Sequence, residues 1–212
     1  MKTLGQCLKQ LMNMDAMNNA EEKITLIGCG ILKKEINWLA KKNHWQLHTS
    51  FLDSALHSDF EKLHKGLTLS IKKHSNEDFI VFYGTCHPLM DNIMHNANCT
   101  RTRGQNCVEI LLGHHLFTDE LSNGAYFLME DWSLRWDIIM TKTFGNNMEV
   151  TRQIFQEDRK YLLGINTPCS GNFTKQAEYA AQSVGLPLKW ITVGLDNLQL
   201  VLESAIKQKT NS

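Results

Sequence analysis

The sequence predicts a single α/β domain built on a doubly wound, largely parallel sheet with helices on both faces. Two observations predict this class: short apolar runs typical of buried strands alternate with segments whose apolar residues recur at helical spacing. The clearest strand is Phe79–Tyr83, an unbroken apolar run that ends at Gly84. A chain of 212 residues, 42% of them hydrophobic, is long enough for one such domain. We therefore assign residues 1–22 to a peripheral N-terminal segment and residues 23–212 to one domain.

Each expected element follows from its own local pattern. Apolar runs bounded by turn residues predict strands at Ile24–Gly28, Trp45–His48, Phe79–Tyr83, Ala97–Thr100, Ala125–Met129, Tyr161–Asn166 and Leu188–Val193. Helical spacing predicts helices over Ile31–Lys42, from Phe60 toward Lys73, from Cys107 onward, around Trp132–Met140, over Glu149–Lys160, around Ala177–Val184 and around Leu198–Ala205. A further short helix is expected within residues 1–22. Pro88 favours a loop, rather than a helix, directly after the central strand.

Composition excludes several classes of function. Lys+Arg and Asp+Glu number 22 each, so the chain lacks the positive excess that binding to a nucleic-acid backbone requires. Met1–Asp15 lacks the apolar core of a signal peptide, and no stretch approaches the roughly 20 apolar residues of a membrane helix. We expect a cytoplasmic protein without nucleic-acid or membrane partners. Its six cysteines are then expected to be thiols, metal ligands or catalytic groups rather than disulfides.

Three cysteines share one structural context. Cys29 follows the first strand, Cys86 follows the central strand, and Cys107 stands where a polar loop enters a helix. Because parallel strands end at the same edge of a sheet, these cysteines should lie together. Thiolates are strong ligands for Zn²⁺, and three protein ligands with an open fourth position are typical of a catalytic zinc site. His57 or His87 could add a ligand or carry a proton.

Other interpretations of the same residues remain open. Free cysteines are often buried in a core, where they only fill space. Alternatively, Cys107 at a helix N-terminus would have a lowered pKa and could act as a nucleophile. The glycines at the strand ends, Gly28, Gly30 and Gly84, could bring the backbone close to a phosphate, a carboxylate or a cofactor. Arg101 and Arg103 precede Cys107 and could hold an anionic ligand at the same edge.

The remaining cysteines, histidines and tryptophans give weaker signals. His114 and His115 are adjacent on a helix and cannot face one ligand, so we interpret them as solvated or packing residues. Trp132 is interpreted as a core aromatic. Cys7 and Cys99 share no context with the other cysteines, whereas Cys169, in T-P-C-S-G after a strand, could approach the edge of the sheet.

Several motifs resemble those of an uncharacterised family, a domain of unknown function common in methanogenic archaea and anaerobic bacteria. The similar segments are I-G-C-G-I-L (27–32), A-L-H (55–57), Y-G-T-C (83–86), N-C-V-E-I-L-L-G (106–113), G-A-Y-F-L (124–128) with Trp132, and the region from 162 to about 202. Cys29, Cys86 and Cys107 fall at the family's motif positions. The family usually has an acidic residue before its third cysteine and a histidine nearby, where this chain has Asn106 and Gln105. The resemblance implies association with corrinoid-dependent methyl transfer.

These observations lead to two hypotheses. The first is a metal-binding, thiolate-site protein that activates a small thiol or assists methyl transfer in one-carbon metabolism, as a metal-dependent transferase or an accessory protein. Its ligands would be Cys29, Cys86, Cys107 and His57, its cofactor zinc, and its partners a small thiol or anionic ligand and a corrinoid protein. The second is a non-enzymatic module that binds a small molecule or cofactor and merely buries the cysteines.

Overall fold

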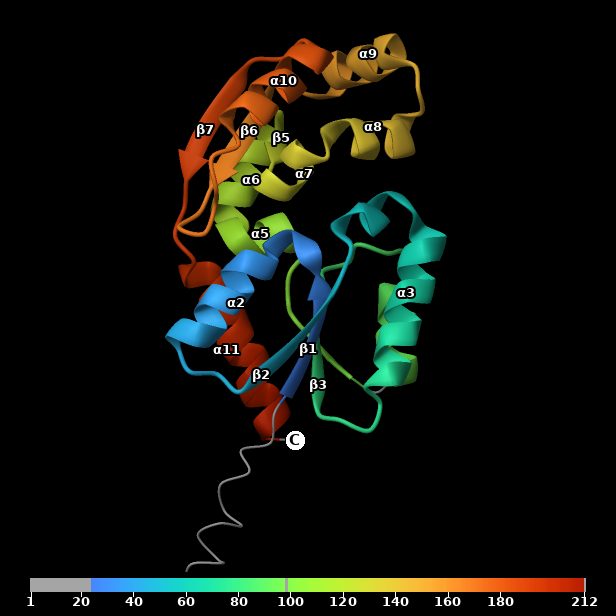
Figure 1. The fold of residues 1–212 in the computed structure, drawn as a ribbon, viewed down its shortest axis with the longest axis vertical. Helices are drawn as coiled ribbons and strands as arrows, with labels where there is room; N and C mark the ends of the chain where they lie inside the picture. Colours follow the sequence, from blue (N-terminus) through green and yellow to red (C-terminus); the bar gives the residue numbers. More distant parts are fainter. Residues whose placement is uncertain (1–23, 98, 212) are drawn as a thin grey trace, which may run out of the picture.

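The computed structural model describes residues 24–97 and 99–211, and within them the strands form two parallel sheets. The first sheet has the order β2-β1-β3-β4 and the second the order β5-β6-β7. The predicted class, parallel α/β with flanking helices, is confirmed. The prediction of one continuous sheet is wrong, because strand pairing stops at β4 and begins again at β5. We call the first sheet with its helices the first lobe, and the second sheet with its helices the second lobe (Figure 1).

The first sheet is built on two strands that are buried along their whole length, as their apolar runs predict. Its strands are β1 (Ile24–Cys29), β2 (Leu47–Leu52), β3 (Phe79–Phe82) and β4 (Thr100–Arg101). Every residue of β1 and β3 is buried. In the parallel register of these strands, Gly28 lies beside Phe82. The residues that follow them, Cys29 and Tyr83, therefore reach the same edge of the sheet.

Helices cover both faces of the first sheet. In chain order the helical elements of this lobe are η1 (Gly30–Leu32), α2 (Lys33–Lys42), η2 (Ser54–Ser58), α3 (Phe60–Lys73), α4 (Met90–Ala97) and α5 (Cys107–Leu112). Figure 1 shows α2 on one face and α3 on the other. The loop predicted from Pro88 is short, because only Pro88 and Leu89 separate His87 from the start of α4 at Met90. The helix α4 was not expected from the sequence.

The second lobe has its own apolar core. It contains α6 (His114–Ser122), β5 (Ala125–Leu128), α7 (Glu130–Leu134), α8 (Trp136–Phe144), α9 (Met148–Asp158), β6 (Tyr161–Asn166), α10 (Thr174–Val184) and β7 (Leu188–Thr192). Trp136, Phe155 and Phe173 pack with the alanines of α10 against Leu128 and Leu162 of the sheet. The small alanines allow α10 to lie close to its neighbours, which is why its helical stripe is made of them.

Helix α11 (Asp196–Thr210) ties the two lobes together. The chain leaves β7 in the second lobe and returns along the first sheet, where α11 lies on the same side as α2 (Figure 1). Leu198 and Leu202 are completely buried in the core of the first lobe. The C-terminal helix is thus part of the first lobe in space, although it follows the second lobe in sequence.

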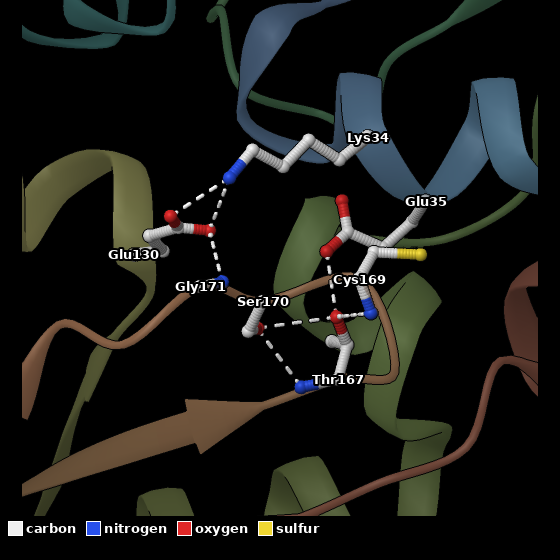
Figure 2. Close-up of polar contacts among 7 residues, drawn as sticks. All are labelled: Lys34, Glu35, Glu130, Thr167, Cys169, Ser170 and Gly171. Atoms are coloured by element: carbon white, nitrogen blue, oxygen red, sulfur yellow. Dashed lines mark hydrogen bonds and ion pairs between the residues drawn. The ribbon is translucent and has the colours of Figure 1, made fainter.

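Polar contacts between α2, α7 and the loop after β6 join the two lobes (Figure 2). Lys34 Nζ, on α2, donates to Glu130 Oε1 of α7 at 2.7 Å. The loop after β6 adds two contacts: Gly171 N donates to Glu130 Oε2 at 3.2 Å, and Thr167 Oγ1 donates to the buried Glu35 at 2.7 Å. Burial raises the pKa of Glu35, partly offset by the Thr167 hydrogen bond. These contacts hold the two lobes at a defined separation.

Several predicted boundaries differ from the observed ones. The second strand was predicted at Trp45–His48, whereas β2 runs to Leu52 through polar residues that an apolar pattern does not reveal. The helix predicted from Cys107 is broken into α5 and α6 at Gly113, whose φ of +80° ends the first segment. The helix expected within residues 1–22 lies outside the described residues. Among the described helices, none is long and apolar enough to cross a membrane.

The buried face of α11 should be essential for stability. We expect Leu202→Ala to lower the free energy of unfolding by about 3 kcal/mol, because it removes a fully buried side chain from a packed core. Leu200→Ala on the same helix is the matched control, since Leu200 is 64% exposed, and it should change stability by less than about 0.5 kcal/mol. Urea unfolding of both variants tests this. Equal effects of the two substitutions would contradict the docking of α11.

Candidate thiolate site and ligand cavity

The three motif cysteines meet at the carboxyl edge of the first sheet. Cys29 is the last residue of β1, Cys86 lies in the loop after β3, and Cys107 is the first residue of α5. Cys29 and Cys107 are 8% and 7% exposed, whereas Cys86 is only partly buried. Cys107 lies close enough to Cys29 and Cys86 to influence their protonation, and all three residues line one cavity. Three segments distant in sequence thus place their thiols side by side.

A close backbone contact places Cys86 next to Cys107. A Cβ atom on Gly84 would lie 2.2 Å from the carbonyl oxygen of Gln105, so only glycine allows the two segments to pass. The same carbonyl accepts a hydrogen bond from the backbone N–H of Thr85 at 2.7 Å. Gly84 and Gln105 each precede a cysteine by two residues, so the contact that joins them also joins the thiols.

Asn106 directs the helix that begins at Cys107. Its side-chain oxygen accepts hydrogen bonds from the backbone N–H groups of Val108 and Glu109, both at 3.0 Å, which is the ordinary role of asparagine before a helix. The carboxylate of Glu109 in turn accepts a hydrogen bond from the backbone N–H of Gln105. Asn106 therefore caps the helix whose first residue is Cys107.

His57 approaches the thiols from η2. Asp53 starts this short helix by accepting a hydrogen bond from Ala55 N at 2.9 Å, and Arg135 of the second lobe bonds Asp53 at 2.6 Å. His57 and Cys86 line the same cavity, and the imidazole contributes to lowering the pKa of Cys86. Its ring also lies 5.4 Å from the ring of Trp132, which belongs to the second lobe.

The environment separates the pKa values of the cysteines. Hydrogen bonding to Cys107, together with the His57 interaction, lowers the pKa of Cys86 to about 5 despite its burial. Hydrogen bonding to Cys29 and Cys86, reinforced by burial, raises the pKa of Cys107 well above its usual value. The prediction that Cys107 has the lowered pKa is wrong: α5 has only six residues, and Cys107 acts as donor to its neighbours. Cys86 is the thiolate of the group.

The thiols form part of the wall of a cavity of about 340 Å³ between the lobes. Aromatic and aliphatic side chains dominate the rest of the wall, and they come from both lobes: Ile31, Leu63, Tyr83, Val108, Phe117, Leu121, Tyr126, Phe127 and Trp132. Asp53, His57 and Arg159 are the titratable side chains that line it besides the cysteines and tyrosines. This cavity, which the three cysteines line, is large enough to hold a small molecule.

Other predicted site residues lie elsewhere. Of the described residues that line the cavity, none is Gly28, Gly30, Gly84, Arg101 or Arg103. The glycines are explained by packing, since a Cβ on Gly28 would press on Phe82 at 3.2 Å and one on Gly30 on the Leu52 carbonyl at 2.9 Å. The two arginines instead line a separate hollow, together with Leu200, Val201 and Ser204 of α11. The prediction that they border the thiol site is therefore wrong.

The remaining candidates are also accounted for. The ring of His87 packs against His64 at 5.4 Å, and its Nδ1 accepts a hydrogen bond from Leu89 N at 2.9 Å, so it serves the loop rather than the thiols. Cys169 lies in the interlobe loop of Figure 2, where its backbone N–H donates to Thr167 Oγ1. Cys99 contacts the sulfur of Met94 at 3.5 Å. Cys7 lies outside the described residues.

The sequence reasoning missed the contribution of the second lobe to the site. Trp132, interpreted as a core aromatic, instead lines the cavity beside His57. Phe127 and Arg159 line it as well and were not singled out. The available signal was the position of Trp132 in the first turn of the helix that follows the strand β5, at the same kind of sheet edge as the cysteines.

The side chains of Cys29, Cys86, Cys107 and His57 are of the types that bind a soft metal ion, but they are not arranged in a coordination geometry. Three thiols and an imidazole are ligands that Zn²⁺ prefers. In residues 24–97 and 99–211, no group of three or more histidine, cysteine, aspartate or glutamate side chains is arranged so that it could hold a metal ion. The chemistry of the donors and their mutual contact, rather than a formed coordination geometry, therefore connect these residues with a metal.

The Gly84 contact can be tested directly. We expect Gly84→Ala to lower the free energy of unfolding by about 3 kcal/mol, since its methyl group would collide with backbone that cannot move freely. Gly66→Ala in α3 is the control: its methyl group would meet only the ends of the Leu52 and Leu56 side chains, and alanine favours a helix, so the change should stay within about 1 kcal/mol. Thermal unfolding of both variants measures the difference. A Gly84→Ala protein as stable as wild type would refute the close contact.

The lowered pKa of Cys86 predicts selective alkylation of metal-free protein. Because thiolate reacts and thiol does not, Cys86 should react with iodoacetamide with a rate that rises through about pH 5 and levels off near pH 6, while Cys107 stays unmodified. His57→Ala should move this profile to higher pH, whereas His115→Ala, which removes an exposed histidine, should not. Peptide mass spectrometry across pH gives the rates. A midpoint near the ordinary thiol value of about 8.5 would exclude the thiolate.

Comparison with known proteins identifies the family but not an activity. Among solved structures, the crystal structure of transcription regulator CcpA of Lactococcus lactis matches with a TM-score of 0.42 and 6% sequence identity, covering 91% of this chain and 93% of that chain. A likeness of this degree supports no argument about function. No curated protein matches the sequence. Residues 51–202 match the family described as "Protein of unknown function (DUF1638)"; this segment includes His57, Cys86 and Cys107, while Cys29 precedes it. Since the match spans more than half of the chain, the protein belongs to the DUF1638 family.

Proposed function

We propose that this protein uses Cys29, Cys86 and Cys107, with His57 beside them, to bind a soft divalent metal ion such as Zn²⁺ at the wall of a small-molecule cavity. The observation that carries the proposal is the interaction of three thiols from three distant segments at one wall of this cavity. Buried cysteines that only fill a core have no reason to gather in this way. A cluster at a cavity wall is better explained by a shared ligand.

The protonation of the cluster supports this proposal. Metal ligands of this type must be thiolates, so each thiol that still carries a proton has to lose it on binding. Cys86, with a pKa of about 5, has already lost its proton at neutral pH. The remaining thiols would then be drawn toward a cation rather than toward each other. His57 could accept one of the released protons, or take the fourth ligand position.

The proposed chemistry is activation of a small thiol, as part of one-carbon metabolism. When bound, a zinc ion with an open position would hold a thiol substrate as its thiolate, which is the nucleophile in methyl transfer. The protein's own side chains would supply the rest: the aromatic wall would exclude water, and His57 would accept or return the proton of the substrate. A corrinoid protein as methyl donor follows only from the resemblance described above.

A second candidate is a non-enzymatic module that binds an organic molecule or cofactor. The predominance of aromatic and aliphatic side chains in the cavity favours it, since such walls bind small molecules without any metal. In this case the cysteines contribute only packing. Each of the three single alanine variants should then behave alike, with a modest loss of stability and unchanged ligand binding.

Metal content decides between the two candidates. Protein purified without chelator should contain about one equivalent of metal, and Cys29→Ala, Cys86→Ala and Cys107→Ala should each lose most of it, because two thiols bind far more weakly than three. Elemental analysis by mass spectrometry gives the stoichiometry. The triple variant should lose little more than each single variant, as expected for residues that act as a unit.

Matched controls are available in the same chain. Cys99→Ala and Cys169→Ala remove partly buried cysteines that lie apart from the cluster, and both variants should keep the wild-type metal content. Wild-type protein that contains almost no metal, even after zinc is added to the growth medium, would exclude the proposed function. Equal metal loss in the control variants would show that the metal is held elsewhere.

A further inference from the structure

Two buried hydrogen-bond donors in the cavity lack a partner. Among the described residues, Tyr83 Oη and Trp132 Nε1 are buried side-chain atoms with no hydrogen-bond partner, and both residues line the cavity. Native proteins rarely leave such atoms unpaired, because an unsatisfied buried donor costs the full price of its desolvation. The two residues come from different lobes, Tyr83 after β3 and Trp132 from α7. A group that enters the cavity between the lobes could satisfy both.

Both groups act as donors, which defines the chemistry of their partner. A tyrosine hydroxyl carries its proton at neutral pH, so the unpaired hydroxyl of Tyr83 can donate a hydrogen bond. An indole N–H can only donate. The partner therefore has to be a hydrogen-bond acceptor. A partner that can only donate, such as a protonated amine, would leave Trp132 Nε1 unsatisfied, because the indole N–H cannot accept a hydrogen bond.

The wall of the cavity selects the shape of the rest of the ligand. Phe117 and Phe127 stack with their ring centroids 5.1 Å apart and their planes at 21°, and together they form part of the wall. Leu121 and Val108 also line it. Parallel rings and aliphatic groups pack best against a flat and largely apolar body. An extended polar chain would lose its hydration here without finding partners.

The charged residues of the wall are already engaged with other residues. Asp53 forms an ion pair with Arg135 at 2.6 Å. Arg159 forms an ion pair with Asp158 at 3.2 Å. Burial of an anion beside neutral donors alone would be costly, because a buried charge needs an opposite charge. The cavity thus favours a neutral acceptor, such as a carbonyl oxygen, over a carboxylate or phosphate.

We infer that the cavity binds a flat, largely apolar molecule whose neutral acceptor, of the carbonyl type, receives hydrogen bonds from Tyr83 and Trp132. This inference rests on the proposed function only in that the same cavity holds both the ligand and the thiols. It names the class of molecule that would be presented to the thiol site. It also gives the second lobe a role in recognition, since Trp132 belongs to that lobe.

Three probes of similar size test the inference on the full chain. Acetophenone has a flat ring and a carbonyl group, α-methylstyrene replaces the carbonyl oxygen by a methylene group, and benzoate replaces the acceptor by an anionic one. Acetophenone should bind about tenfold more tightly than α-methylstyrene, as expected for one or two neutral hydrogen bonds. Benzoate should bind more weakly than acetophenone. Titrations followed by ¹H–¹⁵N spectra of protein with ¹⁵N-labelled tryptophan give the affinities.

The same spectra report on Trp132 itself. The chain contains five tryptophans, so five indole signals are expected, and the signal that is missing from Trp132→Phe identifies Trp132. This signal should move on addition of acetophenone much more than on addition of α-methylstyrene, because only acetophenone accepts its hydrogen bond. Tyr83→Phe should reduce the preference for acetophenone to about threefold, and the double variant should abolish it.

Conservative controls show whether the substitutions act locally. Tyr179→Phe removes a hydroxyl that is bonded to Asp137, and Trp38→Phe alters a tryptophan that is 42% exposed, so neither should change the preference. If Tyr83→Phe fails to fold, the comparison of the probes on wild-type protein still tests the inference. Equal affinity for acetophenone and α-methylstyrene would overturn it, as expected if the donors serve only water. Tighter binding of benzoate, or no binding of any probe, would also overturn it.

Metal analysis of the same samples separates this inference from the proposed function. Tyr83→Phe and Trp132→Phe leave the thiols in place and should keep the wild-type metal content. A protein without metal that still prefers acetophenone would retain the inference and lose the proposed function. A protein with one metal per chain that does not discriminate between the probes would lose the inference and retain the proposed function.

Discussion

The close approach of Gly84 to the backbone of Gln105 is the contact on which the site depends. It brings together the loop after β3 and the segment before α5, and a Cβ atom at Gly84 would lie 2.2 Å from the Gln105 carbonyl oxygen. The hydrogen bond from Thr85 N to this carbonyl fixes the register of the two segments. Cys86 and Cys107 each follow this contact by two residues, so their side chains lie close together.

The relation between the lobes completes the site. Helix α11 returns from the second lobe to the core of the first, and the polar contacts around Glu130 and Glu35 join the lobes (Figure 2). Both arrangements keep Trp132 beside His57. A shift of one lobe relative to the other would change the cavity and the surroundings of the thiols at once. The shape of the cavity and the surroundings of the thiols are therefore physically linked.

Local sequence patterns predicted the secondary structure correctly where a strand is buried along its whole length. The apolar runs of β1, β3 and β6 identify these strands, since strands buried on both faces consist mainly of apolar residues. The same reasoning failed for β2, which is only half-buried and carries His48, Thr49 and Ser50. It also failed for Arg101, whose direction depends on how β4 joins the sheet rather than on its neighbours in sequence.

The sequence by itself determined the α/β class, the parallel strands, and the convergence of Cys29, Cys86 and Cys107 at one sheet edge, because parallel strands that neighbour each other end together. Only the tertiary structure decided that there are two sheets within the described residues, that Cys86 rather than Cys107 is the thiolate, and that Trp132 completes the cavity. Periodicity reports whether a residue is buried, but it carries no information about which strands pair. A pKa depends on neighbours in space, and for Cys86 those neighbours, Cys107 and His57, come from distant segments of the chain.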